Sequence, residues 1–194
     1  MSYLRFLFLL VFSFLNAVIL ASAHEPAKAH YIANEGVLVT AGDTKIMFDP
    51  LPLSGFGVYM DVPDQVRGDM MAGMPPYDGV DVIFVSHAHR DHFSASEMIA
   101  YMHSNPDTHI VVPQQALDMM KKEAIWEREL RSRITPLNMR GGDDPQSRAV
   151  GDVTFTAVRI PHSGWPAPAR AAVQNMVYRV TLGGAPEAKV TVMH

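Results

Sequence analysis

Three histidines and one aspartate fall within six consecutive positions of the segment VSHAHRDHF, residues 85–93. Their pattern is H-x-H-x-D-H, formed by His87, His89, Asp91 and His92. Imidazole nitrogens and carboxylate oxygens suit zinc, and a catalytic zinc ion commonly has three protein ligands and one water. His87 and His89 could bind one ion. Asp91 and His92 could then face a second ion beside it. The alternative is a set of ordinary buried polar groups, but burying all four without a metal would carry a heavy desolvation cost.

The elements on both sides of this cluster indicate how it is positioned. Residues 80–86 form an apolar run of the kind found in strands that are buried on both faces. Residues 94–104 read as a helix, because Ser94 is a suitable N-cap and Glu97 follows at the capping-box spacing. The cluster is therefore predicted to lie in a turn between a strand and a helix, where side chains can converge in a cleft.

The rest of the sequence predicts an α/β protein, because β-rich runs flank a βαβα middle section. Residues 51–79 are rich in proline and glycine and are expected to form a long loop. Residues 114–134 are expected to form the longest helix, because apolar residues recur there on one helical face. The expected strands lie before and after these segments, over residues 30–50 (a meander of three), 108–113, 153–162, 175–183 and 189–194.

Methionines crowd the expected loop and leave several interpretations open. They could form a flexible apolar lid over a substrate, bind copper, or fill gaps in a core. The four methionines are Met60, Met70, Met71 and Met74.

Composition limits the classes of function. The chain has 194 residues, which suits one domain, and a formal net charge of −4 without any basic block. Nucleic acid is therefore not expected as a partner. The expected partner is a small-molecule substrate. Because the chain has no cysteine, any metal site must use histidine and carboxylate ligands.

The N-terminus has the pattern of a signal peptide. An apolar run at residues 6–20 follows one positive charge, and small residues at 21–23 supply a cleavage site before His24. An uncleaved membrane anchor is the alternative, but the run is short for a membrane span. We therefore expect a signal peptide at residues 1–23 and an exported domain at residues 24–194, periplasmic or secreted and free of the membrane after cleavage.

Three segments resemble the metallo-β-lactamase superfamily. SHAHRDH, at residues 86–92, is similar to the signature of the family. TKIMFDP, ending at Pro50, is similar to its early strand with a following aspartate, and RIPHSG, at residues 159–164, to the strand end that supplies a further histidine. The layout looks most like the branch that includes ascorbate-6-phosphate lactonase. The resemblance implies an αββα sandwich with a zinc site at one edge.

The resemblance also implies roles for individual residues. His87, His89 and His162 would hold the first zinc ion. Asp91 and His92 would belong to the second site, and Asp91 could also orient the nucleophile or accept its proton. Asp49 would brace the metal loops through hydrogen bonds rather than bind zinc. Independently of the resemblance, Trp165 follows His162 closely in the sequence and could line the pocket or lie in the core.

The chain departs from the family pattern at its C-terminal end. The family has a bridging aspartate just beyond a strand such as KVTVMH, and a last histidine further on, whereas this sequence ends at His194. The sandwich is therefore expected to be truncated in its C-terminal half, and His194 is expected to be an incidental residue rather than a ligand.

The implied activity is that of a zinc-dependent hydrolase with one or two ions. Metal-bound hydroxide would attack an ester, lactone, amide or phosphodiester. Two alternatives remain open: a catalytically incomplete protein that only binds metal, and an iron-dependent oxidoreductase of the same fold, since these ligands do not fix the metal.

Overall fold

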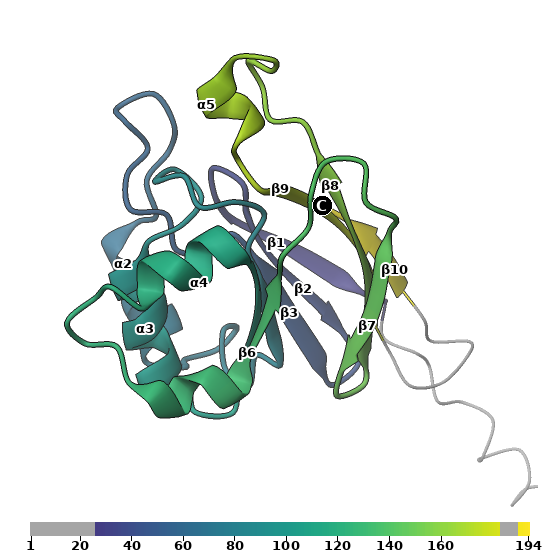
Figure 1. The fold of residues 1–194 in the computed structure, drawn as a ribbon. Helices are drawn as coiled ribbons and strands as arrows, with labels where there is room; N and C mark the ends of the chain where they lie inside the picture. The colour runs from purple at the N-terminus through teal and green to yellow at the C-terminus, as the bar shows by residue number, and fades with distance from the viewer. Residues whose placement is uncertain (1–25, 183–189) are drawn as a thin grey trace, which may run out of the picture.

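The computed structural model describes residues 26–182 and 190–194. The expected signal peptide at residues 1–23 lies outside the described residues. Two β-sheets pack face to face, and helices cover the outer face of the first sheet (Figure 1). In the described part of the chain, no helix is long and apolar enough to cross a membrane.

The first sheet has six strands in sequential order, two antiparallel pairings followed by three parallel ones. Its strands are β1 (Lys28–Ala33), β2 (Gly36–Ala41), β3 (Thr44–Phe48), β4 (Val82–Phe84), β5 (His109–Pro113) and β6 (Ile134–Leu137). Because β3 to β6 run parallel, their carboxyl ends lie at the same edge of the sheet.

Helices in the connections between these strands form the outer layer beside the first sheet. They are α2 (Asp64–Met71), α3 (Ala95–Ser104), α4 (Gln114–Met120) and the 3-10 helix η1 (Arg128–Arg133). The N-cap of α3 is Ser94, whose hydroxyl accepts a hydrogen bond from the Glu97 backbone N–H at 3.3 Å. The predicted N-cap is confirmed. The capping box is not completed, because the Ser94 N–H donates to the Leu51 carbonyl at 2.9 Å and the Glu97 carboxylate pairs with Arg67 at 2.7 Å.

The second sheet is antiparallel, in the order β10-β9-β8-β7. Its strands are β7 (Gln146–Val150), β8 (Val153–Ile160), β9 (Asn175–Leu182) and β10 (Val190–Met193). The connection from β8 to β9 rises above the sheets and contains the short helix α5 (Pro168–Ala171). Within the described residues, no helix covers the outer face of this sheet (Figure 1), so they form an α-β-β part of the αββα sandwich.

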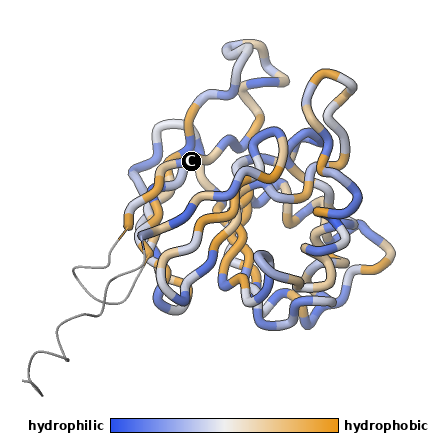
Figure 2. The backbone as a smooth tube through the Cα atoms, turned by 180° about the vertical axis from the view of Figure 1, so that it is seen from behind, coloured by the Kyte–Doolittle hydropathy of each residue, from blue (hydrophilic) through white to orange (hydrophobic). Residues whose placement is uncertain are grey.

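Side-chain alternation in β4 divides the core into two parts. Ile83 belongs to the cluster between the first sheet and the helices, whereas Val82 and Phe84 belong to the cluster between the two sheets. The ring of Phe84 packs 5.3 Å from that of Phe155 and 5.1 Å from that of Tyr178, measured between centroids. In Figure 2, hydrophobic residues are concentrated along the central strands.

Two expectations about helices are wrong. The segment 114–134 is not one helix, because α4 ends at Met120, a turn and η1 follow, and Ile134 begins β6. The segment 51–79 is not all loop, because it contains α2. Met70 on α2 is fully buried, which excludes it from a surface lid.

Candidate metal centre

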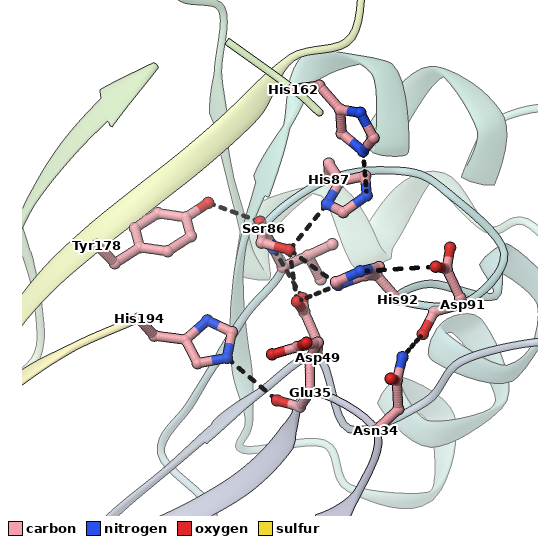
Figure 3. A network of polar contacts seen from close by, with 11 residues as sticks. Asn34, Glu35, Asp49, Ser86, His87, Asp91, His92, His162, Tyr178 and His194 are labelled. Atoms are coloured by element: carbon pink, nitrogen blue, oxygen red, sulfur yellow. Dashed lines mark hydrogen bonds and ion pairs between the residues drawn. The ribbon is translucent and has the colours of Figure 1, made fainter. Parts of the chain in front are cut away.

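The candidate ligands gather at the edge where the strands of the first sheet end. Asp49 directly follows β3, the histidine cluster follows β4, and His162 follows β8 of the second sheet. Figure 3 shows His87, His92 and His162 turned toward one another, with Asp49 behind His87 and His92. A turn after each strand therefore contributes to one site.

His87, His89 and His162 form the first group. Each offers a ring nitrogen, and these nitrogens lie within 4.8 Å of one another. The Nε2 atoms of His87 and His162 are 3.3 Å apart. The three residues predicted to share a metal ion are thus brought together, although they are up to 75 positions apart in the chain.

His87, Asp91 and His92 form the second group, again with ligand atoms within 4.8 Å. The His92 Nε2 atom is 3.9 Å from an Asp91 carboxylate oxygen. The two groups share His87, so they are adjacent. In the described part of the chain, no other carboxylate joins either group.

Asp49 lies behind these groups and belongs to neither of them. It is 1% exposed, and its carboxylate accepts hydrogen bonds from the Ser86 backbone N–H at 2.7 Å and from the Ser86 hydroxyl. The same carboxylate lies 2.8 Å from the Nδ1 atom of His92. This placement suits the bracing role predicted for Asp49.

Ser86 is a site residue that the sequence reasoning missed. Its hydroxyl donates to Asp49 and lies 3.1 Å from His87 Nδ1 and 3.3 Å from His92 Nδ1. It is the first residue of the SHAHRDH segment that resembles the family signature, but no role was predicted for it. A single hydroxyl thereby connects the buried carboxylate to two of the candidate ligands.

These hydrogen bonds define which ring nitrogens carry protons. Because the Ser86 hydroxyl donates its proton to Asp49, it can only accept from His87 Nδ1–H. His162 Nδ1 lies 2.9 Å from the Ser163 carbonyl, which also only accepts. The Nε2 atoms of His87 and His162 therefore present lone pairs to each other across 3.3 Å. Two opposed lone pairs repel, and a bound cation removes that repulsion, so this donor set fits a metal ion.

Comparison with known families gives the same assignment. Residues 44–192 match the profile described as the Beta-lactamase superfamily domain. The chain belongs to the metallo-β-lactamase superfamily.

Solved structures share the fold of this superfamily member at low sequence identity. A candidate metal-dependent hydrolase from Parabacteroides distasonis aligns with a TM-score of 0.52 and 16% identity, over 86% of this chain and 59% of its own. A possible metal-dependent hydrolase from Veillonella parvula gives 0.52 and 17%, over 86% and 61%. The isothiocyanate hydrolase from Delia radicum gut bacteria gives 0.50 and 17%, over 80% and 58%. The chain thus spans about three fifths of their lengths. A search of curated proteins found no match.

The electrostatics of the candidate site favour neutral ligands in the first group. Burial lowers the pKa of His87 to about 2, with help from the neighbouring His92, His89 and His162. The pKa of His89 is also lowered, by burial, by His162 and by the positive charge of Arg170. Neutral imidazoles keep the lone pair that a metal ion needs.

His92 differs from the other two. Burial opposes its charged form, but the hydrogen bond to Asp49 and the negative charges of Asp49 and Asp91 outweigh this and raise its pKa. The cause is the buried carboxylate 2.8 Å from its Nδ1 atom. Asp49 therefore orients this ring and makes it a stronger base.

Neighbouring backbone contacts hold the histidine segment in place. The Tyr178 hydroxyl, which is buried on β9, donates to the Val85 carbonyl at 2.7 Å. The Met176 N–H donates to the Ser86 carbonyl at 2.9 Å, and the Asn34 amide donates to the Asp91 carbonyl at 2.8 Å. Both sheets thus fix the backbone on either side of His87.

The connection that carries His162 is fastened at its far end. Gln115 at the start of α4 and Gln174 each donate a backbone N–H to the other's side-chain oxygen, at 3.0 and 2.8 Å. Arg159 donates to the carbonyls of Ala171 and Val173 at 2.9 and 3.0 Å. These contacts limit how far the exposed segment can move relative to the first sheet.

Two other candidate residues lie apart from the ligand groups. His194 stacks on Phe48 at 4.6 Å, and its Nε2 lies 3.1 Å from the Glu35 carbonyl, so it contacts the core and a turn instead. Trp165 is 59% exposed, which excludes the core position considered for it.

Proposed function

We propose that this chain provides the metal site of a metal-dependent hydrolase that uses zinc. One observation carries the proposal: three imidazoles from two sheets present ring nitrogens within 4.8 Å of one another, with the facing lone pairs of His87 and His162 only 3.3 Å apart. Because the chain spans about three fifths of its structural neighbours, the activity proposed is that of the whole protein.

Each residue of the site has a defined task in this proposal. His87, His89 and His162 hold the first ion, and Asp91 with His92 faces a second position beside it. When bound, zinc supplies a Lewis acid and an activated water at neutral pH. The Asp91 carboxylate, which is partly exposed in the same cleft, accepts the proton of the attacking water. Asp49 and Ser86 keep the histidine rings in the orientation and tautomer that bind.

The bond to be cleaved belongs to an ester, lactone, amide or phosphodiester. Such centres share an electrophilic carbon or phosphorus atom whose attack places negative charge on an oxygen atom. A cleft of about 520 Å³ opens onto His89, Asp91, His92 and His162, and a cleft of this volume fits a small molecule.

The test measures bound metal and hydrolysis separately. The full chain, purified without chelators, is analysed by native mass spectrometry and elemental analysis and then assayed against 4-nitrophenyl acetate, a homoserine lactone and bis(4-nitrophenyl) phosphate. We expect zinc, at one or two ions per chain, and turnover of at least one substrate. The variants His87→Ala and His162→Ala should lose both, while His103→Ala, at an exposed position on α3, should keep both.

Other outcomes would replace the proposal with one of its alternatives. Bound zinc without turnover of any substrate would leave a protein that only binds metal. Bound iron with redox activity would indicate an oxidoreductase. A chain that binds no metal at all would contradict the proposed site.

We also propose that the protein is exported to the periplasm or secreted, because residues 1–23 have the signal-peptide pattern. N-terminal sequencing of the protein purified from its own host tests this. A mature chain that begins at His24 is expected, and a chain that retains Met1 in the cytoplasm would contradict it.

A further inference from the structure

Two arginines lie in the same cleft as the candidate ligands. Arg90, within the histidine segment, and Arg170, on α5, both line the cleft of about 520 Å³. Asp91 is the only carboxylate among the described residues that line it. With the histidines neutral, the lining carries a net positive charge in a chain whose formal net charge is −4.

Neither guanidinium group takes part in the contacts that stabilise the fold. Among the described residues, no hydrogen bond or ion pair involves the side chain of Arg90 or Arg170, and both residues are exposed. Other arginines are bonded: Arg133 donates to three backbone carbonyls and Arg159 to three. Two free guanidinium groups in one cleft favour an anionic ligand, because their fork geometry matches carboxylate and phosphate oxygens.

An apolar loop also lines this cleft. Phe56 and Tyr59 are lining residues and are 56% and 50% exposed. The loop is held against the histidine segment, since the N–H groups of Leu53 and Ser54 both donate to the Arg90 carbonyl, at 2.7 and 3.0 Å. Exposed aromatic rings beside a polar cleft are typical of ligand sites.

The loop is built so that its aromatic rings stay outside the core. The Val58 and Tyr59 N–H groups both donate to the Gly55 carbonyl at 2.9 Å, and Asp61 accepts from the Gly55 N–H at 2.6 Å. Phe56 has a φ of 56°, a left-handed conformation that is costly for a bulky residue. A tight turn with such a residue at its tip presents the ring to the cleft.

We propose that the cleft selects a small anionic substrate that carries an aromatic or aliphatic group. Arg90 and Arg170 hold the carboxylate, phosphate or sulfonate of the substrate, and Phe56 and Tyr59 pack against its apolar part. Arg170 is the main determinant of this selectivity because it lines the cleft from the connection between β8 and β9, which is separate from the histidine segment. This inference names the substrate class of the proposed hydrolase and rests on that function.

The test measures binding without turnover, on the full chain both as purified and after dialysis against EDTA. Isothermal titration uses three probes: naphthalene-2-sulfonate, methanesulfonate as the anion without a ring, and 2-naphthol as the ring without an anion. We expect naphthalene-2-sulfonate to bind tightest in both states of the protein. Arg170→Gln should weaken its binding about tenfold, as expected for the loss of a charge-assisted contact, and Arg170→Lys should weaken it less.

Matched variants separate a specific site from general attraction. Arg128→Gln removes the same charge from the exposed start of η1, outside the cleft, and should leave binding unchanged. Phe56→Ala should weaken the binding of naphthalene-2-sulfonate but not that of methanesulfonate. Equal effects of Arg128→Gln and Arg170→Gln, or equal affinity for 2-naphthol and the sulfonate, would overturn the inference. Selective anion binding by a protein without hydrolysis would contradict only the proposed function, and hydrolysis without anion selectivity would contradict only this inference.

Discussion

Protonation of His87 should determine how the stability of the metal-free chain depends on pH. His87 is almost fully buried among three other histidines, and burial together with these neighbours lowers its pKa from 6.5 to about 2. In the unfolded chain the ring has no such neighbours and titrates at its ordinary value. Between these two pKa values the unfolded state binds a proton that the folded state does not.

The sign and size of the effect follow from this difference. As the pH falls below 6.5, the free energy of unfolding should fall by about 1.4 kcal/mol per pH unit from His87 alone. At pH 5 the loss is roughly 2 kcal/mol, a large part of the typical stability of a domain. His89 acts in the same direction because its pKa is also lowered.

The titration of His92 changes the free energy of unfolding in the opposite direction and in another pH range. Its pKa in the folded chain is raised, so its contribution is fully present below pH 6.5 and is lost as the pH rises through the folded-state pKa. The metal-free chain should therefore be most stable near pH 6.5. It should lose stability more steeply on the acid side, where two histidines contribute.

Urea denaturation of EDTA-treated protein, followed by circular dichroism between about pH 7.5 and pH 5, measures this dependence. His87→Asn keeps an N–H that can donate to Ser86 but cannot titrate, so its acid slope should be shallower by about 1.4 kcal/mol per pH unit. His103→Asn, at an exposed position, should keep the wild-type slope. An unfolding free energy that is flat from pH 6.5 to pH 5, or a His87→Asn slope equal to that of wild type, would refute the reasoning.

Three further substitutions test the supports of the site. Asp49→Asn replaces one acceptor oxygen by a donor. It should weaken zinc binding by about 10- to 100-fold, measured by competition with a chelating dye. It should also lower the pKa of His92, which NMR can follow. Gln174→Ala removes an acceptor from the fastening of the connection between β8 and β9, so its amide protons should exchange faster while the melting temperature changes little. Tyr178→Phe leaves the buried Val85 carbonyl without its hydroxyl donor and should lower the unfolding free energy by about 1 to 3 kcal/mol in urea; an unchanged value would show that water replaces the donor.

The ligand cluster could be predicted from the sequence because most of its members are close in the chain. His87, His89, Asp91 and His92 occupy one turn, and a turn between a buried strand and a capped helix leaves such side chains few directions to point. His162 lies 75 positions beyond His87, and no local pattern places it there. Its assignment depended on the family resemblance, which the match over residues 44–192 confirms at the level of the superfamily.

The errors in secondary structure also have physical causes. Helical spacing of apolar residues predicted one helix over 114–134, but Ile134 is buried as part of β6, where parallel pairing with Ile110 uses it as a strand residue. Tertiary pairing thus overrode the local pattern. The edge strand β7 escaped prediction because its residues Gln146–Val150 are mostly polar and exposed, so no apolar alternation marks it.

The polar network behind the ligands shows why residue types alone do not define such a site. Ser86 and Asp49 bind no candidate metal position, yet they determine which nitrogen of His87 is free. The SHAHRDH segment contains Ser86, but the residue type alone does not indicate this role. The result is a folded chain that holds two lone pairs 3.3 Å apart. That arrangement costs stability in the metal-free state and becomes favourable when a cation lies between the rings, so folding and metal binding must be coupled. The acid sensitivity of the metal-free chain has a different origin, because burial of His87, rather than the facing lone pairs, is the main cause of its low pKa.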